Sequence, residues 1–125
     1  MRKQIETDGA PKATSILSQA IESNGFIFVS GQIHQTLEGE VTGGSVADKV
    51  AQIMLNIGTV LMVAGASLKD VVKATIYVTD MHQMIELNTT YPNYFIDPLP
   101  ALEAVCVKSL PLGATIEISV IAAKP

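Results

Sequence analysis

Residues 45–65, SVADKVAQIMLNIGTVLMVAG, decide the fold of this chain. Ser45 and Asp48 are spaced as a capping box at the start of the stretch, and Gly65 fits a helix stop at its end. Gly58 in the interior costs about 1 kcal/mol relative to alanine, which predicts a close packing contact there. Between these signals, apolar residues recur at helical spacing on one face: Val46, Val50, Ile53, Met54, Ile57, Val60, Leu61 and Ala64. We therefore predict one long core helix.

Strand-like stretches lie on both sides of this helix. Residues 26–33 are rich in β-branched and aromatic side chains and follow an Asn-Gly turn, so we predict a hairpin with a short strand at 17–21. Gly31 indicates a bulge or a close backbone approach. Residues 1–15 are predicted to be irregular or an edge strand. Residues 71–79 form a strand with one face made by Val72, Ala74, Ile76 and Val78.

The remaining elements complete an α+β pattern. A second helix begins near Asp80 and is broken at Pro92, because proline cannot continue the helical hydrogen bonds. Two closing strands, 101–107 and 115–123, flank a Leu-Pro-Leu-Gly turn and are predicted to pair as an antiparallel hairpin. The order ββ-α-β-α-ββ predicts a mixed sheet with both helices on one face, in a single domain over residues 1–125.

The composition predicts a covered surface. Only 16% of the residues are charged and 48% are apolar, whereas an ordinary soluble domain has about 25% charged residues. A chain of this size has much surface to keep wet, so we expect another subunit to cover part of it. The alternative is a monomer with an uncharged polar coat of Thr, Ser, Asn and Gln.

The charge distribution disfavours nucleic acid as a partner. Twelve acidic residues outnumber eight basic ones, the basic residues are scattered singly, and there is no tryptophan for stacking against bases. The apolar stretches are amphipathic or short and the start of the chain has no apolar leader, so no membrane segment is predicted. Cys106 is the single cysteine and can form no internal disulfide. The cytoplasm is the expected compartment.

Several motifs, in this order and spacing, resemble the Rid family of reactive intermediate deaminases, which is also called YjgF-like and was formerly described as liver perchloric-acid-soluble endoribonuclease. The resemblance covers residues 3–123. It implies a chorismate-mutase-like fold and a homotrimer with small-molecule clefts between subunits. It also implies hydrolysis of enamines and imines, such as 2-aminoacrylate and 2-iminobutanoate, to 2-keto acids and ammonia, without metal or organic cofactor. The motifs are Ser18-Gln19-Ala20, Phe28 to Ile33, Val71 to Thr75, Asn88 with Tyr91 and Phe95, and Leu110-Pro111 through Ile116-Glu117-Ile118.

The resemblance also implies a set of site residues. Glu117 matches the acidic residue that helps to hold the water, and it is the candidate catalytic residue. Ala104 offers a backbone N–H near the substrate carboxylate. The other candidate substrate-binding positions are Leu17, Ser30, Gly31, Asn88 and Leu102. From the residues alone, Glu117 is equally consistent with a surface or interface carboxylate, and Asn88 with a structural hydrogen-bonding role. Neither histidine has a partner at metal-ligand spacing, so no metal site is predicted.

Two of these positions depart from the family pattern. The family arginine that follows Pro-Ala is replaced by Leu102, and the family tyrosine before Ser-Gln-Ala is replaced by Leu17. Arg2 is the only arginine in the chain, so no shifted register restores the missing group. Losing a charge-assisted contact to a carboxylate typically costs several kcal/mol.

Three functions therefore stay open. We predict a member that is weak or inactive as an imine deaminase and that binds or processes a less anionic metabolite. The alternative is an active 2-iminobutanoate/2-iminopropanoate deaminase with a substitute anchor, such as Lys108 or a neighbouring subunit's lysine. An endoribonuclease or translation inhibitor is the least favoured, because the chain is acidic and has no basic groove.

Overall fold

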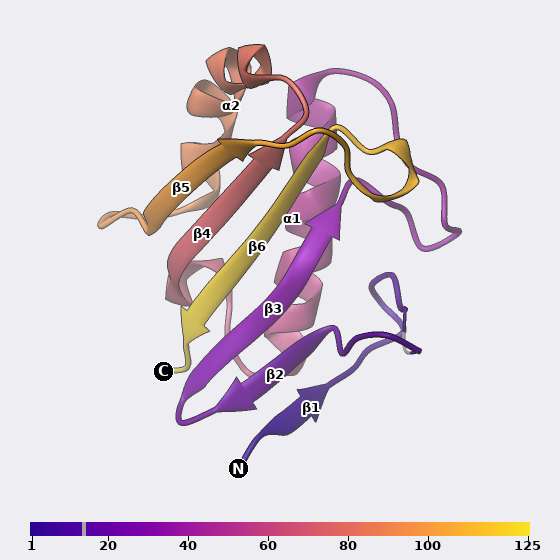
Figure 1. Cartoon of the computed structure of the whole chain (residues 1–125). Helices are drawn as coiled ribbons and strands as arrows, with labels where there is room; N and C mark the ends of the chain where they lie inside the picture. Colours follow the sequence, from indigo (N-terminus) through magenta and orange to yellow (C-terminus); the bar gives the residue numbers. More distant parts are fainter. Residues whose placement is uncertain (14) are drawn as a thin grey trace.

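The computed structural model describes residues 1–13 and 15–125, which form a six-stranded mixed sheet in the order β1-β2-β3-β6-β4-β5 (Figure 1). Two α-helices cross the sheet on one side. The predicted α+β architecture, with both helices on one face, is confirmed. The elements are β1 (Lys3–Ile5), β2 (Ala20–Ser23), β3 (Phe26–Ile33), α1 (Val46–Val63), β4 (Val71–Val78), α2 (Met84–Thr90), β5 (Ala101–Cys106) and β6 (Ile116–Ala123).

Helix α1 begins and ends as its sequence predicts. The Asp48 amide donates to the Ser45 side chain at 3.1 Å, and the Asp48 carboxylate accepts from the Ser45 amide at 3.3 Å, which completes the capping box. At the other end Gly65 has φ +85° and its amide donates to the Met62 carbonyl at 3.0 Å. The Ala66 amide donates to the Leu61 carbonyl at 2.9 Å, so the helix ends in a Schellman motif.

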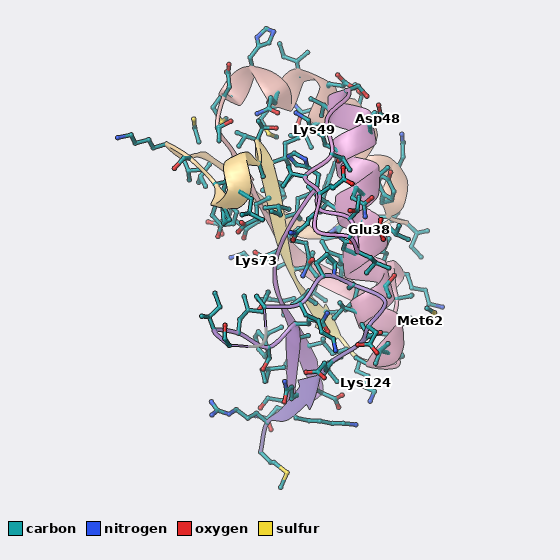
Figure 2. All side chains as sticks on the ribbon, turned by 90° about the vertical axis from the view of Figure 1, so that its right-hand side faces the viewer. Glu38, Asp48, Lys49, Met62, Lys73 and Lys124 are labelled. Atoms are coloured by element: carbon teal, nitrogen blue, oxygen red, sulfur yellow. The ribbon has the colours of Figure 1, made fainter. Side chains whose placement is uncertain are left out.

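The core lies between α1 and the sheet, which form the two layers seen edge-on in Figure 2. Every second residue of β6 is buried against the helices: Ile116, Ile118, Val120 and Ala122. Burying each large aliphatic side chain contributes about 1.5–3 kcal/mol, so this strand is a main source of stability. The intervening residues of β6, Glu117 among them, are half-buried on the opposite, uncovered face of the sheet.

Helix α1 is long and apolar enough to cross a membrane by length and composition alone. In the fold it is the core helix, because its apolar face packs against the sheet. The buried residues are Val50, Ile53, Met54, Asn56, Ile57, Val60 and Leu61. Gly58 does not make the predicted close contact, since a Cβ atom built there meets no atom within 4 Å.

The predicted hairpin of the last two strands is wrong. Strand β4 lies between β5 and β6, pairing parallel with the first (Ala74 opposite Leu102) and antiparallel with the second (Ala74 opposite Val120). The connection after β5 steps across the end of β4, so two strands that are close in sequence are not neighbours in the sheet (Figure 1). The segment containing α2 supplies the crossover that a parallel pair requires.

Smaller differences arise at strand ends. The first predicted strand begins at Ala20 rather than Leu17, and the predicted edge strand is β1, which pairs with β2; the prediction for residues 1–15 includes Thr14, which lies outside the described residues. Val72 is exposed, contrary to the predicted face, because a bulge between Val71 and Lys73 turns it outward.

The predicted break in the second helix is confirmed. Asp80 caps a 3₁₀ turn that leads into α2, and Pro92 lies in a second 3₁₀ turn, Tyr91–Tyr94, that follows it. Asn88 is exposed on α2. The Tyr91 hydroxyl is buried without a hydrogen-bond partner among the described residues, and burial raises the pKa of Tyr91 to about 12.

Candidate functional site

The site is built on a bulge in the middle of β3. Val29 pairs with Val120 and Gln32 pairs with Ile118, so two residues, Ser30 and Gly31, lie opposite the single residue between them on β6. The prediction of a bulge at Gly31 is therefore confirmed. A bulge redirects the side chains beside it, and here it leaves the backbone of β3 next to the Glu117 side chain.

Gly31 leaves the space that the Glu117 carboxylate fills. A Cβ atom built on Gly31 would overlap the Glu117 Oε2 atom and would lie 2.8 Å from the Glu117 Cδ atom. The predicted close approach at Gly31 is thus also present, and its cause is a carboxylate rather than a neighbouring backbone. Any side chain at this position would displace Glu117 from its place against β3.

A cleft of about 310 Å³ opens over this pair. It brings together four predicted site residues: Leu17, Ser30, Gly31 and Glu117. The Ser30 hydroxyl donates to the Ser18 carbonyl at 2.6 Å, so its hydrogen is used within the fold. The rest of the lining is mainly apolar and comprises Pro11, Lys12, Ala13, Ile16, Gln32, Ile33, Gln35, Pro111 and Leu112.

Glu117 is a titratable group of the cleft whose environment perturbs its pKa. Burial raises its pKa above the ordinary value of 4.5, because desolvation disfavours the charged carboxylate. Among the described residues no hydrogen bond or ion pair to this carboxylate is present. A carboxyl group with a raised pKa in a cleft is able to exchange protons with a bound water or ligand.

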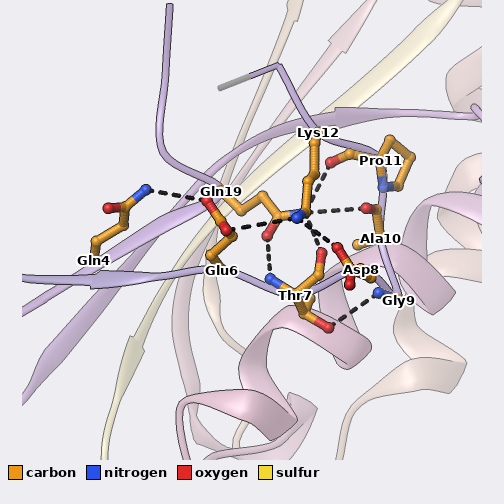
Figure 3. Close-up of polar contacts among 9 residues, drawn as sticks. All are labelled: Gln4, Glu6, Thr7, Asp8, Gly9, Ala10, Pro11, Lys12 and Gln19. Carbon is orange, nitrogen blue, oxygen red and sulfur yellow. Dashed lines mark hydrogen bonds and ion pairs between the residues drawn. The ribbon is translucent and has the colours of Figure 1, made fainter. Parts of the chain in front are cut away.

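Lys12 is the only lysine or arginine among the residues that line this cleft, and sequence reasoning missed it. Its ammonium group is paired with the carboxylates of Asp8 and, at 3.5 Å, Glu6 (Figure 3). The spacing of Asp8 and Lys12, four residues apart, is the one signal in the sequence that points to this pair. The cleft therefore has a cation at its rim whose charge is already balanced.

The other predicted site residues lie elsewhere. Leu102 is 42% exposed on β5 at the far edge of the sheet, and Ala104 on the same strand is half-buried against the core. Asn88 is exposed on α2. None of these three residues lines the cleft of a single chain. The structure thus divides the predicted site into a Glu117 part and a β5 part.

His34 has a structural role next to the cleft. It is buried; its Nδ1 atom donates to the Thr42 carbonyl at 2.8 Å, and its Nε2 atom accepts from the Thr115 amide at 3.0 Å. The Thr115 N–H fixes the neutral tautomer, and burial lowers the pKa of His34. No cluster of three or more His, Cys, Asp and Glu side chains within residues 1–13 and 15–125 is arranged to hold a metal ion.

Comparisons with known proteins point to one family. The profile of the family described as Endoribonuclease L-PSP matches residues 7–124. A RutC family protein of Pyrococcus horikoshii is 41% identical, with 99% of each chain covered. A protein of Rattus norvegicus named 2-iminobutanoate/2-iminopropanoate deaminase is 39% identical, covering 98% of this chain and 90% of the relative.

A solved structure agrees with these relatives in fold. The crystal structure of yeast Mmf1 matches with a TM-score of 0.95 and 34% identity over 100% of both chains. The Saccharomyces cerevisiae relative named Protein MMF1, mitochondrial, is 36% identical, covering 94% of this chain and 81% of the relative. Because one relative is named as mitochondrial, the cytoplasmic location of this chain stays a prediction.

Proposed function

This chain belongs to the Rid family, whose profile is described as Endoribonuclease L-PSP, and on that premise we propose that its Glu117 cleft takes a small metabolite that carries no carboxylate at its reacting end. In this proposal the chain turns over 2-iminobutanoate weakly or not at all. It needs no metal or organic cofactor, and the complete site forms between the subunits of a homotrimer.

One observation carries the proposal. The reacting region of the cleft presents the Glu117 carboxylate, and the only cation in the lining, Lys12, is already paired with two carboxylates. A ligand carboxylate close to Glu117 would meet a like charge without a free cation to offset it. An uncharged ligand meets apolar walls from Leu17 and its neighbours, and desolvating it costs little.

The chemistry proposed for the cleft is hydrolysis of a carbon–nitrogen double bond. A water oxygen adds to the imine carbon while the nitrogen takes a proton, and the carbinolamine then loses ammonia to leave a carbonyl group. Glu117 holds the water, accepts a proton from it as the oxygen adds, and passes that proton to the imine nitrogen; it then takes the hydroxyl proton of the carbinolamine and delivers it to the departing nitrogen. Its raised pKa suits both steps, because a group that acts as both base and acid works best when its pKa lies near the working pH.

The position of β5 supports a site shared between subunits. In one chain Leu102 and Ala104 lie on the edge strand β5, which β4 separates from β6, and they do not line the cleft, although the family resemblance assigns them to the same pocket. An edge strand has one unpaired side, and β5 presents exposed apolar side chains there. A neighbouring subunit that covers this edge would join the two parts. Light scattering on a sizing column tests this, and the mass of one subunit would contradict it.

The direct test compares two ligand classes. We expect 2-iminobutanoate hydrolysis by the unaltered protein to stay close to the buffer rate. We also expect small uncharged carbonyl or imine compounds to raise the melting temperature more than 2-keto acids do. Rapid turnover of 2-iminobutanoate would contradict the proposed ligand class and leave the family assignment intact.

An active 2-iminobutanoate/2-iminopropanoate deaminase is the second candidate, and the identity to a relative with that name favours it. It requires a substitute anchor, such as Lys108 or a lysine of a neighbouring subunit; Lys12 would serve only after it leaves Asp8 and Glu6. Endoribonuclease activity is least favoured, because the net charge is −4 and the basic residues are scattered singly along the sequence, which gives little attraction for a phosphate backbone.

A further inference from the structure

The segment 7–12 contributes Pro11 and Lys12 to one wall of the cleft, and its polar contacts to the rest of the chain are few. Among the described residues no backbone–backbone hydrogen bond joins it to another part of the chain. Within residues 1–13 and 15–125, the hydrogen bonds of its backbone to the rest of the chain end on the side chain of Gln19 (Figure 3). The backbone hydrogen bonds of this loop therefore depend on one side chain, while Ala10 adds apolar packing in the core.

The Gln19 amide directs its oxygen and its NH₂ group into this loop. Its Oε1 atom accepts from the Thr7 amide at 2.7 Å. Its Nε2 atom donates to the carbonyls of Thr7, Ala10 and Pro11 at 3.0, 3.0 and 2.9 Å, so one N–H is shared between two acceptors. The side chain is only 3% exposed, and an unpaired amide there would be costly.

The backbone of Ser18 and Gln19 contacts the opposite wall of the cleft, at Ser30. The Gln19 carbonyl accepts from the Ser30 amide at 2.9 Å, and the neighbouring Ser18 carbonyl accepts from the Ser30 hydroxyl at 2.6 Å. Ser30 is part of the bulge that places Gly31 against Glu117. One short segment therefore contacts the wall that carries Pro11 and Lys12 and the wall that carries Glu117.

From this arrangement we infer that Gln19 is a positioning residue: its side chain fixes the loop 7–12 across the cleft and thereby sets how closed the cleft is around Glu117. The inference rests on the proposed site at Glu117 but not on the identity of its ligand. Gln19 touches no reacting atom, because its amide points into the loop and not into the cleft.

The test replaces Gln19 and reads the apo protein. Gln19→Met keeps the length of the side chain and removes the donors and the acceptor. We expect the Thr7 amide to exchange with solvent at least about tenfold faster, as loss of one protecting hydrogen bond implies. We also expect the pKa of Glu117, followed by NMR of its carboxyl carbon, to fall toward the ordinary value of 4.5 as water enters the cleft.

Leu87→Ala is the matched control. Leu87 is fully buried on α2, lines no part of the cleft, and its loss destabilises the fold without touching the loop. It should leave the Glu117 pKa unchanged. If Gln19→Met is too unstable to study, Gln19→Glu keeps the acceptor for the Thr7 amide and loses the donors. Exchange at the Thr7 amide should then stay close to that of the parent, while the pKa of Glu117 should still fall.

Two outcomes overturn the inference. One is a Glu117 pKa in folded Gln19→Met equal to that of the parent, which would mean that packing of Ala10 alone holds the loop. The other is an equal pKa change in Leu87→Ala, which would make the effect one of general stability. Because both readouts use the protein without substrate, failure here is distinguishable from failure of the proposed ligand class.

Discussion

The cleft at β3 and the free edge at β5 carry the two parts of the predicted site, and they are built differently. At the cleft, a bulge, a glycine and a buried amide hold Glu117 and its surroundings within one chain. At the edge, Leu102 and Ala104 belong to a strand that is paired on one side only and mostly exposed. The difference teaches that the Glu117 cleft forms within a single chain, whereas Leu102 and Ala104 lie on an edge strand that, in our proposal, a neighbouring subunit covers.

The largest expected effect comes from restoring a positive charge at position 102. Leu102→Arg, combined with Leu17→Tyr, restores the family residues, and one charged partner contributes about 2–5 kcal/mol. We expect 2-iminobutanoate hydrolysis to rise at least about 30-fold, which is about 2 kcal/mol at about 1.4 kcal/mol per tenfold. The measurement is the steady-state rate of the double variant beside the parent, with a check that both have the same mass in solution.

A mixing experiment shows whether the two parts come from different subunits. A variant with Leu102→Arg and Glu117→Gln has the anchor but no acid, and the parent has the acid but no anchor. After subunit exchange, hybrid sites should hydrolyse 2-iminobutanoate although neither protein does so alone. If the mixture is no faster than the sum of its components, the two parts do not meet between subunits.

The next effect compares the stability of the two regions. Ile118 is fully buried at the centre of the sheet, so Ile118→Ala should lower the free energy of unfolding by about 2–5 kcal/mol. Leu102→Ala should lower it by only about 1–2 kcal/mol in a dissociated chain, because the side chain is 42% exposed there. Urea denaturation at several protein concentrations separates the cases; a large loss for Leu102→Ala only in the assembled protein would show that the edge is covered.

The sequence predicts the cleft better than the edge for a physical reason. The capping box of α1 and the bulge at Gly31 follow from local patterns that the structure repeats. The neighbour of β5 depends on a strand far away in sequence, so the apparent hairpin signal misleads. Gln19 and Lys12 were missed because their contacts join side chains to a loop whose path no pattern of polarity reveals.

A smaller effect is expected where Gly31 touches Glu117. In Gly31→Ala the new methyl group takes the place of the carboxylate, which turns toward solvent. Alanine is favoured over glycine in a strand by about 0.5–1 kcal/mol, so overall stability should change by no more than about this amount. The pKa of Glu117 should fall toward 4.5 as burial is lost. An unchanged pKa, measured by NMR titration, would mean that Gly31 does not create the site.

The smallest effect is a change in how stability depends on pH. The folded pKa of Glu117 is raised, so the folded state binds more protons above pH 4.5 and stability falls as pH rises through that window. The folded pKa of His34 is lowered, so stability falls as pH drops below 6.5. The two slopes oppose each other. Glu117→Gln removes only the slope that Glu117 contributes and leaves the slope from His34. The melting temperature of the variant should therefore fall more steeply on acidification than that of the parent. Parallel pH profiles for the two proteins would show that Glu117 is solvated like an ordinary surface carboxylate, and the cleft would then differ little from the exposed edge.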